Sequence, residues 1–567
     1  MNERFKTIVR SAVLFLLLLS PNLYACCTAS DLSTPSKTIA YLLVVCIGLT
    51  LPMLLFRRRA YFIIVGALCL FYAPIEIACL YLNHNPATAS FMGLIYATNW
   101  REVIGIISAV WPLLIGLISI WTIYFILALR QPNDWMIPRK MGLRVFCIGI
   151  SSLLVTAMCI FYRYSRNIYN IRDTKESILF AKDLTLMKFN KIFPYNIYIS
   201  TQQILIEHQE MKRAQKSLKS FQFGVNSLHD STPEIYILVI GEAARSGNFS
   251  INGYHRTTNP HLEERRNLVT YPHMYAQAGT TELSVPHMIS RISILRHNDF
   301  YIEKTLPEAF QEAGFMTSWM TNKSRASYLQ RVLDAADRCF ETGKDMSTIN
   351  NYDILLLTPL QEVLNQNANK QFVVLHTMGS HWKYDTRYTP EFEKFTPSIG
   401  KDFRLSMIAP NNKKQLINAY DNTILYTDYF MDSLISIVER QKISALVIYM
   451  SDHGENLYDD DRKLVLHGNY SASRWLFHVP FIIWYSDEYA ALYPDKIKQL
   501  YAHTDTHDNS SLLFHSIIDA AGLYYINDTT SNVTLRTRSI FSEEYCAPDT
   551  LYVLTTEGDC VVLEEAD

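Results

Sequence analysis

The first 165 residues consist mostly of long apolar runs, whereas the rest of the chain mixes apolar and polar positions as a water-soluble domain does. A helix needs about 20 apolar residues to cross a bilayer. Five runs are close to that length, and they predict membrane-spanning helices at about 8–26, 38–56, 61–83, 103–129 and 142–163. A cleaved signal peptide is an alternative for the first run, although Tyr24 fits poorly into a cleavage site.

Basic residues gather in alternate loops between these runs. They lie before the first run, between the second and third (Arg57–Arg59), and between the fourth and fifth (Arg130–Arg144), whereas 27–37 and 84–102 are poor in Lys and Arg. Because basic loops stay in the cytoplasm, this pattern predicts a cytoplasmic N-terminus and an external C-terminal part. We therefore expect a multi-pass protein of the bacterial inner membrane with a periplasmic catalytic domain.

The predicted organisation has three parts. A transmembrane domain covers 1–165, a linker covers 166–232, and the catalytic domain covers 233–567. Within the linker, about 200–218 has helical periodicity with a basic polar face, which is typical of a helix on the membrane surface. A connecting helix packed on the next domain is an equally good interpretation.

Short apolar runs in the C-terminal part each end in a polar cluster. The clearest are EIYILVI (234–240), QFVVL (371–375) and ALVIYM (445–450). Helical patterns lie between and after them, at 305–313, 354–367, 413–440 and 508–522. Buried strands alternating with amphipathic helices predict an α/β fold with a mostly parallel central sheet. In such a sheet, sites form at the carboxyl ends of the strands, where all three polar clusters lie.

Charge and cysteine content add little to this picture. A net charge of −2 over 567 residues gives no general attraction for nucleic acid, and we expect no such partner. Only Cys339, Cys546 and Cys560 fall in the C-terminal part. A Cys546–Cys560 disulfide would be possible in an oxidising compartment, and free thiols are an equally good interpretation.

The run SDHGE, directly after the strand at 445–450, is the strongest chemical signal. Asp452 and His453 offer an oxygen and an imidazole, a common pair of zinc ligands. Glu242 follows the strand at 234–240 and can reach the same cleft. Thr281 opens a helical segment, where free N–H groups attract an anion and a metal would lower the pKa of the hydroxyl group. A threonine that only caps the helix is the ordinary alternative.

Two histidines and one dipeptide are further candidates. His381 (in HTMGSH) and His467 (in LHG) could bind a second metal, hold a phosphate oxygen or protonate a leaving group. Asn322 and Lys323 follow another short strand and could contact a phosphate. For each of these four residues, a place on the surface or in the core is the plain alternative.

Six motifs occur in a fixed order along the chain: GEAARSGNFSINGYHRTTNPHL, TTELSVP, HTMGSHWKYDTRYTPEFEKFTP, INAYDNTILYTDYF, SDHGENL and LHG. Together they resemble the bacterial phosphoethanolamine transferase family over nearly the whole chain. The resemblance implies five N-terminal spans and a periplasmic domain of the alkaline phosphatase/sulfatase type. Because the chain has few cysteines near the TTELSVP stretch, it resembles the members that modify core sugars or glucans more than the disulfide-rich members that modify lipid A.

The resemblance also implies roles for individual residues. Four would be zinc ligands (Glu242, Thr281, Asp452 and His453), with Thr281 also the nucleophile. The outer histidines, His381 and His467, would bind the phosphoryl group or a second zinc ion. Asn99 and Glu102, in YATNWRE, would help to hold the lipid substrate.

The expected activity is transfer of phosphoethanolamine from phosphatidylethanolamine to a lipopolysaccharide or periplasmic glucan acceptor, through a phospho-threonine intermediate. Alternatives on the same fold are a phosphoglycerol transferase, a phosphodiesterase or a sulfatase, although no CxPxR-type sulfatase segment is present. A non-catalytic membrane scaffold would have a broken ligand set, and this chain retains all four residues.

Overall fold

The structure is a computed structural model that describes residues 3–28, 35–83, 86–87, 100–167, 192–202, 205, 218, 220–228, 232–295, 303–323, 332–342, 352–366, 368–400, 409–467, 473–555 and 560–563. The chain forms two compact units, Met1–His208 and Gln209–Asp567. The sequence predicted three parts (1–165, 166–232 and 233–567) where the structure has two units, and the boundaries of the three parts stay a prediction.

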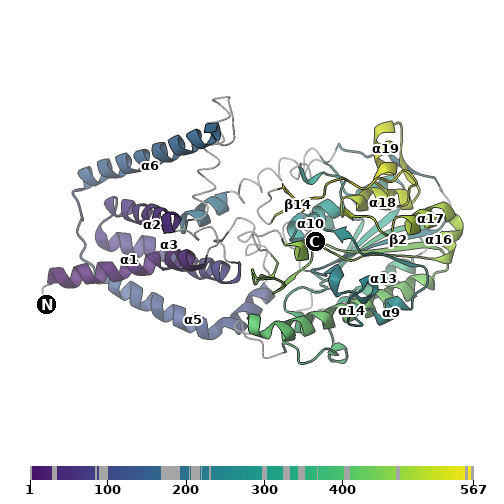
Figure 1. Ribbon diagram of the computed structural model, residues 1–567, viewed down its shortest axis with the longest axis horizontal. Coiled ribbons are helices and arrows are strands. Elements are labelled where there is room, and N and C mark those ends of the chain that lie inside the picture. The colour runs from purple at the N-terminus through teal and green to yellow at the C-terminus, as the bar shows by residue number, and fades with distance from the viewer. Residues whose placement is uncertain are drawn as a thin grey trace. The chain divides into compact units, whose positions relative to one another are not determined.

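Long helices make up the described part of the N-terminal unit (Figure 1). They are α1 (Glu3–Thr28), α2 (Pro35–Thr50) with the 3-10 turn η2 (Leu51–Leu54), α3 (Arg58–Asn83), α5 (Trp100–Leu129) and α6 (Arg139–Asn167). Each of the five expected spans coincides with a helix. Of the described residues, only Glu3–Thr28 and Arg58–Tyr81 form helices long and apolar enough to cross a membrane, and the apolar helices Thr38–Leu54 and Ile115–Leu129 are shorter. Five crossings therefore stay a prediction.

A buried carboxylate holds the part of the linker around Asn196. Glu76 on α3 accepts hydrogen bonds from Nδ2 of Asn196 (2.8 Å) and from the backbone N–H of Ala87 (3.0 Å). Since a buried carboxylate is tolerated only when it is hydrogen-bonded, these contacts fix the helical segment 192–202 inside the N-terminal unit. The surface helix expected at about 200–218 lies almost entirely outside the described residues.

A seven-stranded sheet forms the centre of the C-terminal unit, in the order β3-β11-β8-β2-β7-β5-β6 (Figure 1). Its strands are β2 (Glu234–Gly241), β3 (Leu268–Tyr271), β5 (Met316–Thr321), β6 (Arg338–Glu341), β7 (Lys370–His376), β8 (Ser444–Ser451) and β11 (Phe481–Tyr485). β2 is parallel to β7 and β8, and β5 is parallel to β6 and β7, but β11 is antiparallel to both β8 and β3.

The sheet is therefore mixed, and the expectation of a mostly parallel sheet is wrong. The physical reason lies in the connection between β8 and β11. A parallel return needs a long crossover, usually a helix, whereas the described part of this connection has the short strands β9 (Asn456–Leu457) and β10 (Val465–Leu466) and, as its only helix, the four-residue α15 (Arg474–Phe477). β11 is buried throughout, and a uniformly apolar run carries no signal for its direction.

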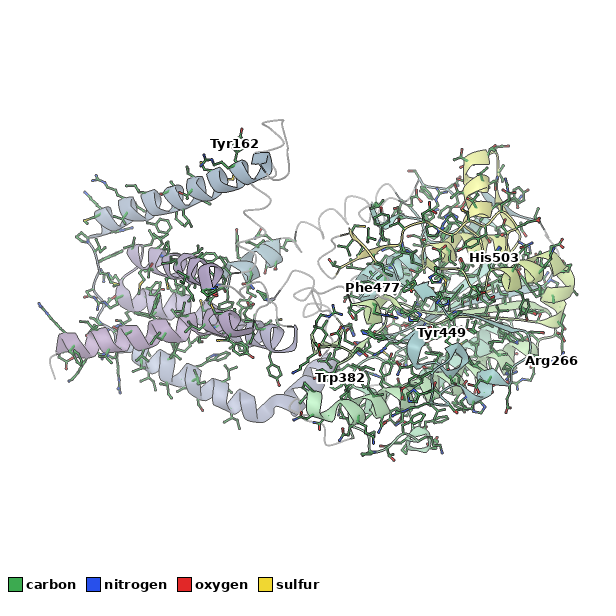
Figure 2. All side chains as sticks on the ribbon, viewed as in Figure 1. Tyr162, Arg266, Trp382, Tyr449, Phe477 and His503 are labelled. Atoms are coloured by element: carbon green, nitrogen blue, oxygen red, sulfur yellow. The ribbon has the colours of Figure 1, made fainter. Side chains whose placement is uncertain are left out.

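Helices cover both faces of the sheet, with α9, α13 and α14 on one side and α10 and α18 on the other (Figure 1). Tyr236, Leu238 and Ile240, alternate residues of β2, join the core that α10, α11 and α18 share. Side chains fill the space on both sides of the sheet, and Tyr449 projects from β8 (Figure 2). The helices are α9 (Pro260–Glu263), α10 (Thr281–Met288), α11 (Leu306–Glu312), α13 (Leu357–Leu364), α14 (Lys413–Glu439), α15, α16 (Asp487–Leu492), α17 (Pro494–Ala502), α18 (Leu512–Ala520) and α19 (Thr529–Thr537).

The four predicted helical segments correspond to α11, to α13 with its preceding 3-10 turn, to α14 and to α18. Two-stranded ladders complete the unit: β1 (Val225–Ser227) with β13 (Leu523–Tyr525), β4 (Met274–Tyr275) with β12 (Asp508–Asn509), β9 (Asn456–Leu457) with β10 (Val465–Leu466), and β14 (Tyr552–Leu554) with β15 (Cys560–Val562). The 3-10 turns are η3 (Ser246–Asn248), η4 (Ser250–Asn252), η7 (Asp353–Leu356), η8 (Tyr384–Thr386), η9 (Pro390–Phe392) and η11 (Pro410–Asn412). Cys546 and Cys560 are both free and exposed.

Candidate active site

The carboxyl ends of β2 and β8 bring two acidic side chains together. The parallel register sets Gly241 opposite Ser451, so that Glu242 and Asp452 leave the sheet at the same edge. The backbone N–H of Asp452 donates to the carbonyl oxygen of Gly241 (3.0 Å). Both carboxylates are fully buried, which is costly unless a cation or hydrogen-bond donors compensate their charge.

The turn after β8 orients Asp452 and His453. Oδ1 of Asp452 accepts hydrogen bonds from the N–H groups of Ala243 (3.2 Å) and His453 (2.7 Å). Its Oδ2 is buried and has no hydrogen-bond partner among the described residues. Nδ1 of His453 lies 2.7 Å from the carbonyl oxygen of Gly454, so Nδ1 carries the proton. Nε2 is left 3.5 Å from Oε1 of Glu242.

Thr281 is the first residue of α10, and its hydroxyl group joins this cluster. Oγ1 lies 3.1 Å from Oε2 of Glu242 and 3.4 Å from Nε2 of His453. The N-cap position is occupied by Thr280, whose backbone is extended and whose side chain makes no capping hydrogen bond. The alternative in which Thr281 only caps its helix is therefore wrong, and the four predicted ligands come together.

The two outer histidines lie beside the same carboxylate. One donor atom each from Glu242, Asp452 and His453 lies within 4.8 Å of the others, and the same holds for Glu242, His381 and His467. The ring of His467 lies 4.4 Å from that of His453 and 5.7 Å from that of His381, measured between centroids. Glu242 thus belongs to two neighbouring groups, each of which could hold a metal ion.

A glycine allows the loop of His381 to approach Glu242. The N–H of Ser380 donates to the carbonyl oxygen of Glu242 (2.9 Å). Gly379 has φ +43°, and a Cβ atom there would lie 2.7 Å from the same oxygen. Since no L side chain fits that space, only glycine permits this approach.

Lys323 and Asn322, the predicted phosphate contacts, have different surroundings. Nζ of Lys323 forms a short ion pair with Oε2 of Glu242. Asn322 is buried, and its Nδ2 donates to Oδ1 of Asp353 (3.1 Å). Lys323 is therefore part of the cluster, whereas Asn322 joins a neighbouring hydrogen-bond network.

The ionisation of the cluster is strongly coupled. Burial favours the neutral form of Glu242, but Lys323 and His453 outweigh it and hold the pKa of Glu242 well below its ordinary value. Burial and the Glu242 carboxylate raise the pKa of Asp452 to about 6. Burial opposes the charging of His453, yet the two carboxylates raise the pKa of this imidazole to about 10. The cluster thus holds a proton at neutral pH that a bound cation would displace.

The described residues fit a divalent metal ion. Oδ2 of Asp452 is a buried acceptor that receives no hydrogen bond and lies 3.7 Å from Nε2 of His453, so a bound cation would compensate its charge. Two carboxylates, one imidazole nitrogen and one hydroxyl oxygen form a donor set that suits zinc.

Three supporting residues were not predicted. Asp353 accepts the N–H groups of Met378 (2.7 Å) and Gly379 (2.8 Å) in the loop of His381. Oε1 of Glu455 lies 3.1 Å from Nδ1 of His467. The hydroxyl group of Ser284 on α10 donates to the carbonyl oxygen of Asp452 (2.5 Å). Glu455 lies within SDHGE and Ser284 within TTELSVP, whereas Asp353 lies in none of the six motifs.

Asn99 and the side chain of Glu102 lie outside the described residues, so their predicted role in holding lipid stays a prediction.

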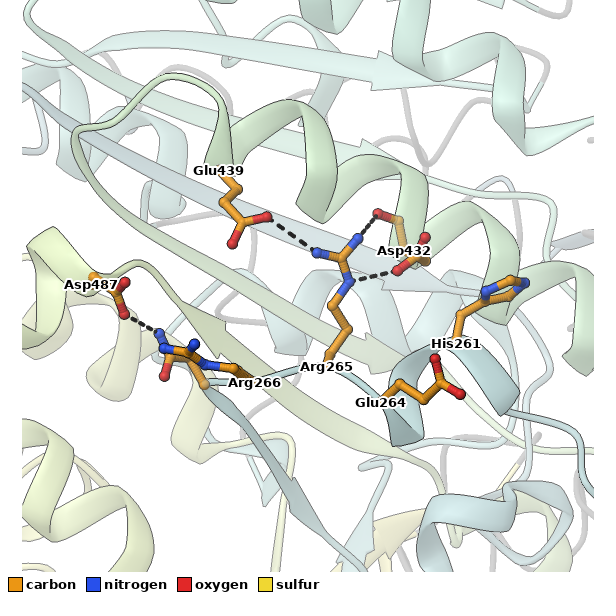
Figure 3. Close-up of a pocket in the computed structure, with 8 residues that line it drawn as sticks. His261, Glu264, Arg265, Arg266, Asp432, Glu439 and Asp487 are labelled. Carbon is orange, nitrogen blue, oxygen red and sulfur yellow. Dashed lines mark hydrogen bonds and ion pairs between the residues drawn. The ribbon is translucent and has the colours of Figure 1, made fainter.

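A charged cavity of about 470 Å³ lies away from this cluster (Figure 3). Arg265 crosses it, with Nε 2.5 Å from Oδ1 of Asp432 and Nη1 3.3 Å from Oε2 of Glu439. Asp487, which follows β11, lines the same cavity. Because α14 ends at Glu439, just before β8 begins, this cavity lies at the opposite end of β8 from Asp452 and is separate from the site.

An edge-of-sheet cluster of acidic, histidine and hydroxyl groups is an arrangement that could hold a metal ion next to a hydroxyl group. A model of the sulfatase family matches residues 234–523, which is just over half of the chain. The chain therefore belongs to the sulfatase family.

Curated relatives carry a more specific name. Phosphoethanolamine transferase EptA of Escherichia coli (strain K12) is 31% identical over 313 residues, covering 52% of this chain and 54% of the relative. Phosphoethanolamine transferase EptC of the same strain is 29% identical over 307 residues, covering 52% of each protein. The chain thus matches about half the length of these curated relatives.

Solved structures are similar in the same region. The C-terminal periplasmic domain of EptC from Escherichia coli, in complex with Zn, is 26% identical with a TM-score of 0.51 and covers 58% of this chain and 91% of that one. The integral membrane protein EptA from Neisseria meningitidis, a lipooligosaccharide phosphoethanolamine transferase, is 20% identical with a TM-score of 0.64, covering 82% and 84%. The latter similarity concerns the fold, and because it covers 82% of this chain it extends into the N-terminal unit as well.

Proposed function

We propose that this protein is a membrane-bound, zinc-dependent phosphoethanolamine transferase. It moves phosphoethanolamine from phosphatidylethanolamine to a glycan or lipopolysaccharide of the cell envelope, through a phospho-threonine intermediate on Thr281. The named relatives support the chemical class of the transferred group.

One observation carries the proposal. The hydroxyl group of Thr281 lies at the first turn of α10 and faces both Glu242 and His453. The free N–H groups of that turn favour an anion next to the same oxygen. A nucleophile and an anion-binding helix end therefore meet at one point, which is what transfer of a phosphoryl group needs.

Glu242, Thr281, Asp452 and His453 would hold one zinc ion. When bound, zinc supplies positive charge that lowers the pKa of the threonine hydroxyl group and stabilises the charge of the phosphoryl group. A second zinc ion held by Glu242, His381 and His467 is the alternative to a direct contact between these two histidines and the phosphoryl group.

The proposed reaction has two displacements at phosphorus. First, Oγ1 of Thr281 forms a bond to phosphorus, the bond to the glycerol oxygen breaks, and diacylglycerol leaves with a proton. Then a hydroxyl oxygen of the acceptor attacks phosphorus, the bond to Oγ1 breaks, the proton of the acceptor passes to Oγ1, and phosphoethanolamine is left on the acceptor. His381 and His467 hold the phosphoryl oxygens and exchange the proton, while Lys323, with Asn322 beside it, supplies positive charge.

The N-terminal unit has its own part in this proposal. Five spans at 8–26, 38–56, 61–83, 103–129 and 142–163 would leave the N-terminus in the cytoplasm and the catalytic domain (233–567) in the periplasm, joined by a linker at 166–232. Holding the catalytic domain at the bilayer that contains the donor lipid makes the encounter local. Asn99 and Glu102 would bind the lipid.

The acceptor is proposed to be a core sugar of lipopolysaccharide or a periplasmic glucan. The absence of disulfides among the described cysteines of the C-terminal unit fits the cysteine-poor members of the group better than the lipid A-modifying ones.

Two assays test the proposal. The purified full-length protein is given phosphatidylethanolamine with a labelled headgroup, and release of diacylglycerol is measured. Mass spectrometry then compares lipopolysaccharide and glucans from cells with and without the gene. Phosphatidylglycerol, a phosphodiester and an aryl sulfate serve as competing substrates, and a preference for one of them would replace phosphoethanolamine transfer with that activity.

A further inference from the structure

A short ladder places Glu455 opposite His467. β9 begins one residue after Glu455, β10 ends one residue before His467, and the antiparallel register pairs Asn456 with Leu466. The pairing is reinforced by a hydrogen bond from Nδ2 of Asn456 to the carbonyl oxygen of Leu466 (2.8 Å). This register therefore brings the carboxylate of Glu455 and the imidazole of His467 together at the same end of the ladder.

Their contact is direct and mostly sheltered from water. Nδ1 of His467 lies 3.1 Å from Oε1 and 3.4 Å from Oε2 of Glu455. Glu455 is fully buried, and Oε2 also accepts a hydrogen bond from the hydroxyl group of Tyr384 (3.2 Å). Among the described residues, no Lys or Arg side chain forms an ion pair with Glu455. The imidazole and the hydroxyl group of Tyr384 thus supply the side-chain hydrogen bonds that this buried carboxylate needs.

The contact decides which ring nitrogen of His467 is available. A carboxylate accepts only, so Nδ1 must carry the hydrogen that faces Glu455. Nε2 is then the nitrogen left for the group formed with Glu242 and His381. Without Glu455, the ring could turn or carry its hydrogen on the other nitrogen.

We infer that Glu455 is a positioning residue that acts through His467, keeping Nε2 of this histidine directed at the phosphoryl group during transfer. This inference rests on the proposed function. The inference goes beyond the proposed function because Glu455, the last residue of SDHGE, supports the outer histidine His467 and does not bind the metal. Supporting residues of this kind change activity by about 10–100-fold.

A double-mutant cycle with E455A, H467A and E455A/H467A in the full-length protein tests the inference. We expect E455A to lower kcat about 10–100-fold with a smaller change in KM, and E455Q, which keeps an oxygen acceptor, to recover part of the loss. Because Glu455 acts through His467, the double variant should be no slower than H467A. Full additivity of the two losses would overturn the inference, since Glu455 would then act by another route.

Two measurements keep the inference separate from folding and from the proposed function. Zinc content and the midpoint of thermal unfolding are measured for every variant. If E455A lost the zinc ion held by Glu242, Asp452 and His453, Glu455 would not act only through His467, and the inference would be overturned. The cycle is run on bis(p-nitrophenyl) phosphate as well as on phosphatidylethanolamine. If only the former reacts, the proposed donor is wrong, while the coupling between Glu455 and His467 is still measured.

Discussion

Oγ1 of Thr281 lies 3.1 Å from Oε2 of Glu242, and this contact joins the first turn of α10 to the carboxyl end of β2. Residues 39 positions apart in the sequence thus meet in one buried cluster.

Replacing Thr281 should abolish the transfer reaction by removing the nucleophile. We expect T281A to lose about 10³-fold or more of its transfer activity, because the atom that forms the covalent intermediate is gone. T281S keeps a hydroxyl group and should keep part of the activity. The measurement is release of diacylglycerol, with mass spectrometry of the peptide that contains position 281. A phosphoethanolamine adduct elsewhere in the wild-type protein would contradict the assignment.

Asp452 and Lys323 should affect metal binding in opposite ways. D452N removes the buried Oδ2 charge, so we expect zinc affinity to fall by at least about 100-fold and activity to fall with it. K323M removes a cation that competes for Glu242, so zinc should bind at least as tightly while turnover falls about 10–100-fold. Competition with a chelator gives the affinities, and K323R serves as the charge-conserving control. Weaker zinc binding in K323M would show that the lysine supports the ligand set.

Glu242 and Asp452 could be placed in one cleft from the sequence because each follows an apolar strand at the edge where parallel strands end. Asp452 and Glu242 are separated by 210 positions, yet the strand pattern alone predicted that they would meet. Asp353 gave no such signal, because its partners are backbone N–H groups of a loop whose path depends on tertiary packing. The direction of β11 was also hidden, since a buried strand reads the same way in either direction.

Asp353 should matter for both stability and activity. It is buried and accepts three hydrogen bonds, from two N–H groups of the loop before His381 and from Asn322. D353A leaves these donors unpaired, which should cost about 1–3 kcal/mol of unfolding free energy and displace His381, lowering kcat/KM. Thermal unfolding and steady-state kinetics measure the two effects.

Glu312 offers a matched control for that experiment. It also accepts two backbone N–H groups, from Phe223 (3.1 Å) and Gly224 (2.9 Å), but it contacts none of the site residues described above. E312A should therefore lower stability by a similar amount with kcat/KM unchanged. An equal loss of kcat/KM in both variants would mean that D353A acts only by weakening the fold.

Asp428 on α14 should make stability depend on pH. Its carboxylate accepts the N–H groups of His261 (3.0 Å) and Leu262 (2.9 Å) at the start of α9. Burial raises the pKa of Asp428 to about 6, and the two N–H groups oppose the shift. Since the pKa of an unfolded Asp is about 3.9, the folded protein binds the proton more tightly between about pH 4 and pH 6.

This difference fixes the sign of the effect. The favourable contribution of the protonated group is complete below about pH 4 and is lost as the pH rises through 6, with a total of up to about 3 kcal/mol. D428N cannot titrate, so its stability relative to the wild type should rise between pH 4 and pH 7. Thermal unfolding of both proteins in the same detergent at several pH values measures the difference. Because the N–H groups keep an oxygen acceptor in D428N, a constant offset between the two curves would mean that Asp428 has the same pKa in the folded and unfolded states.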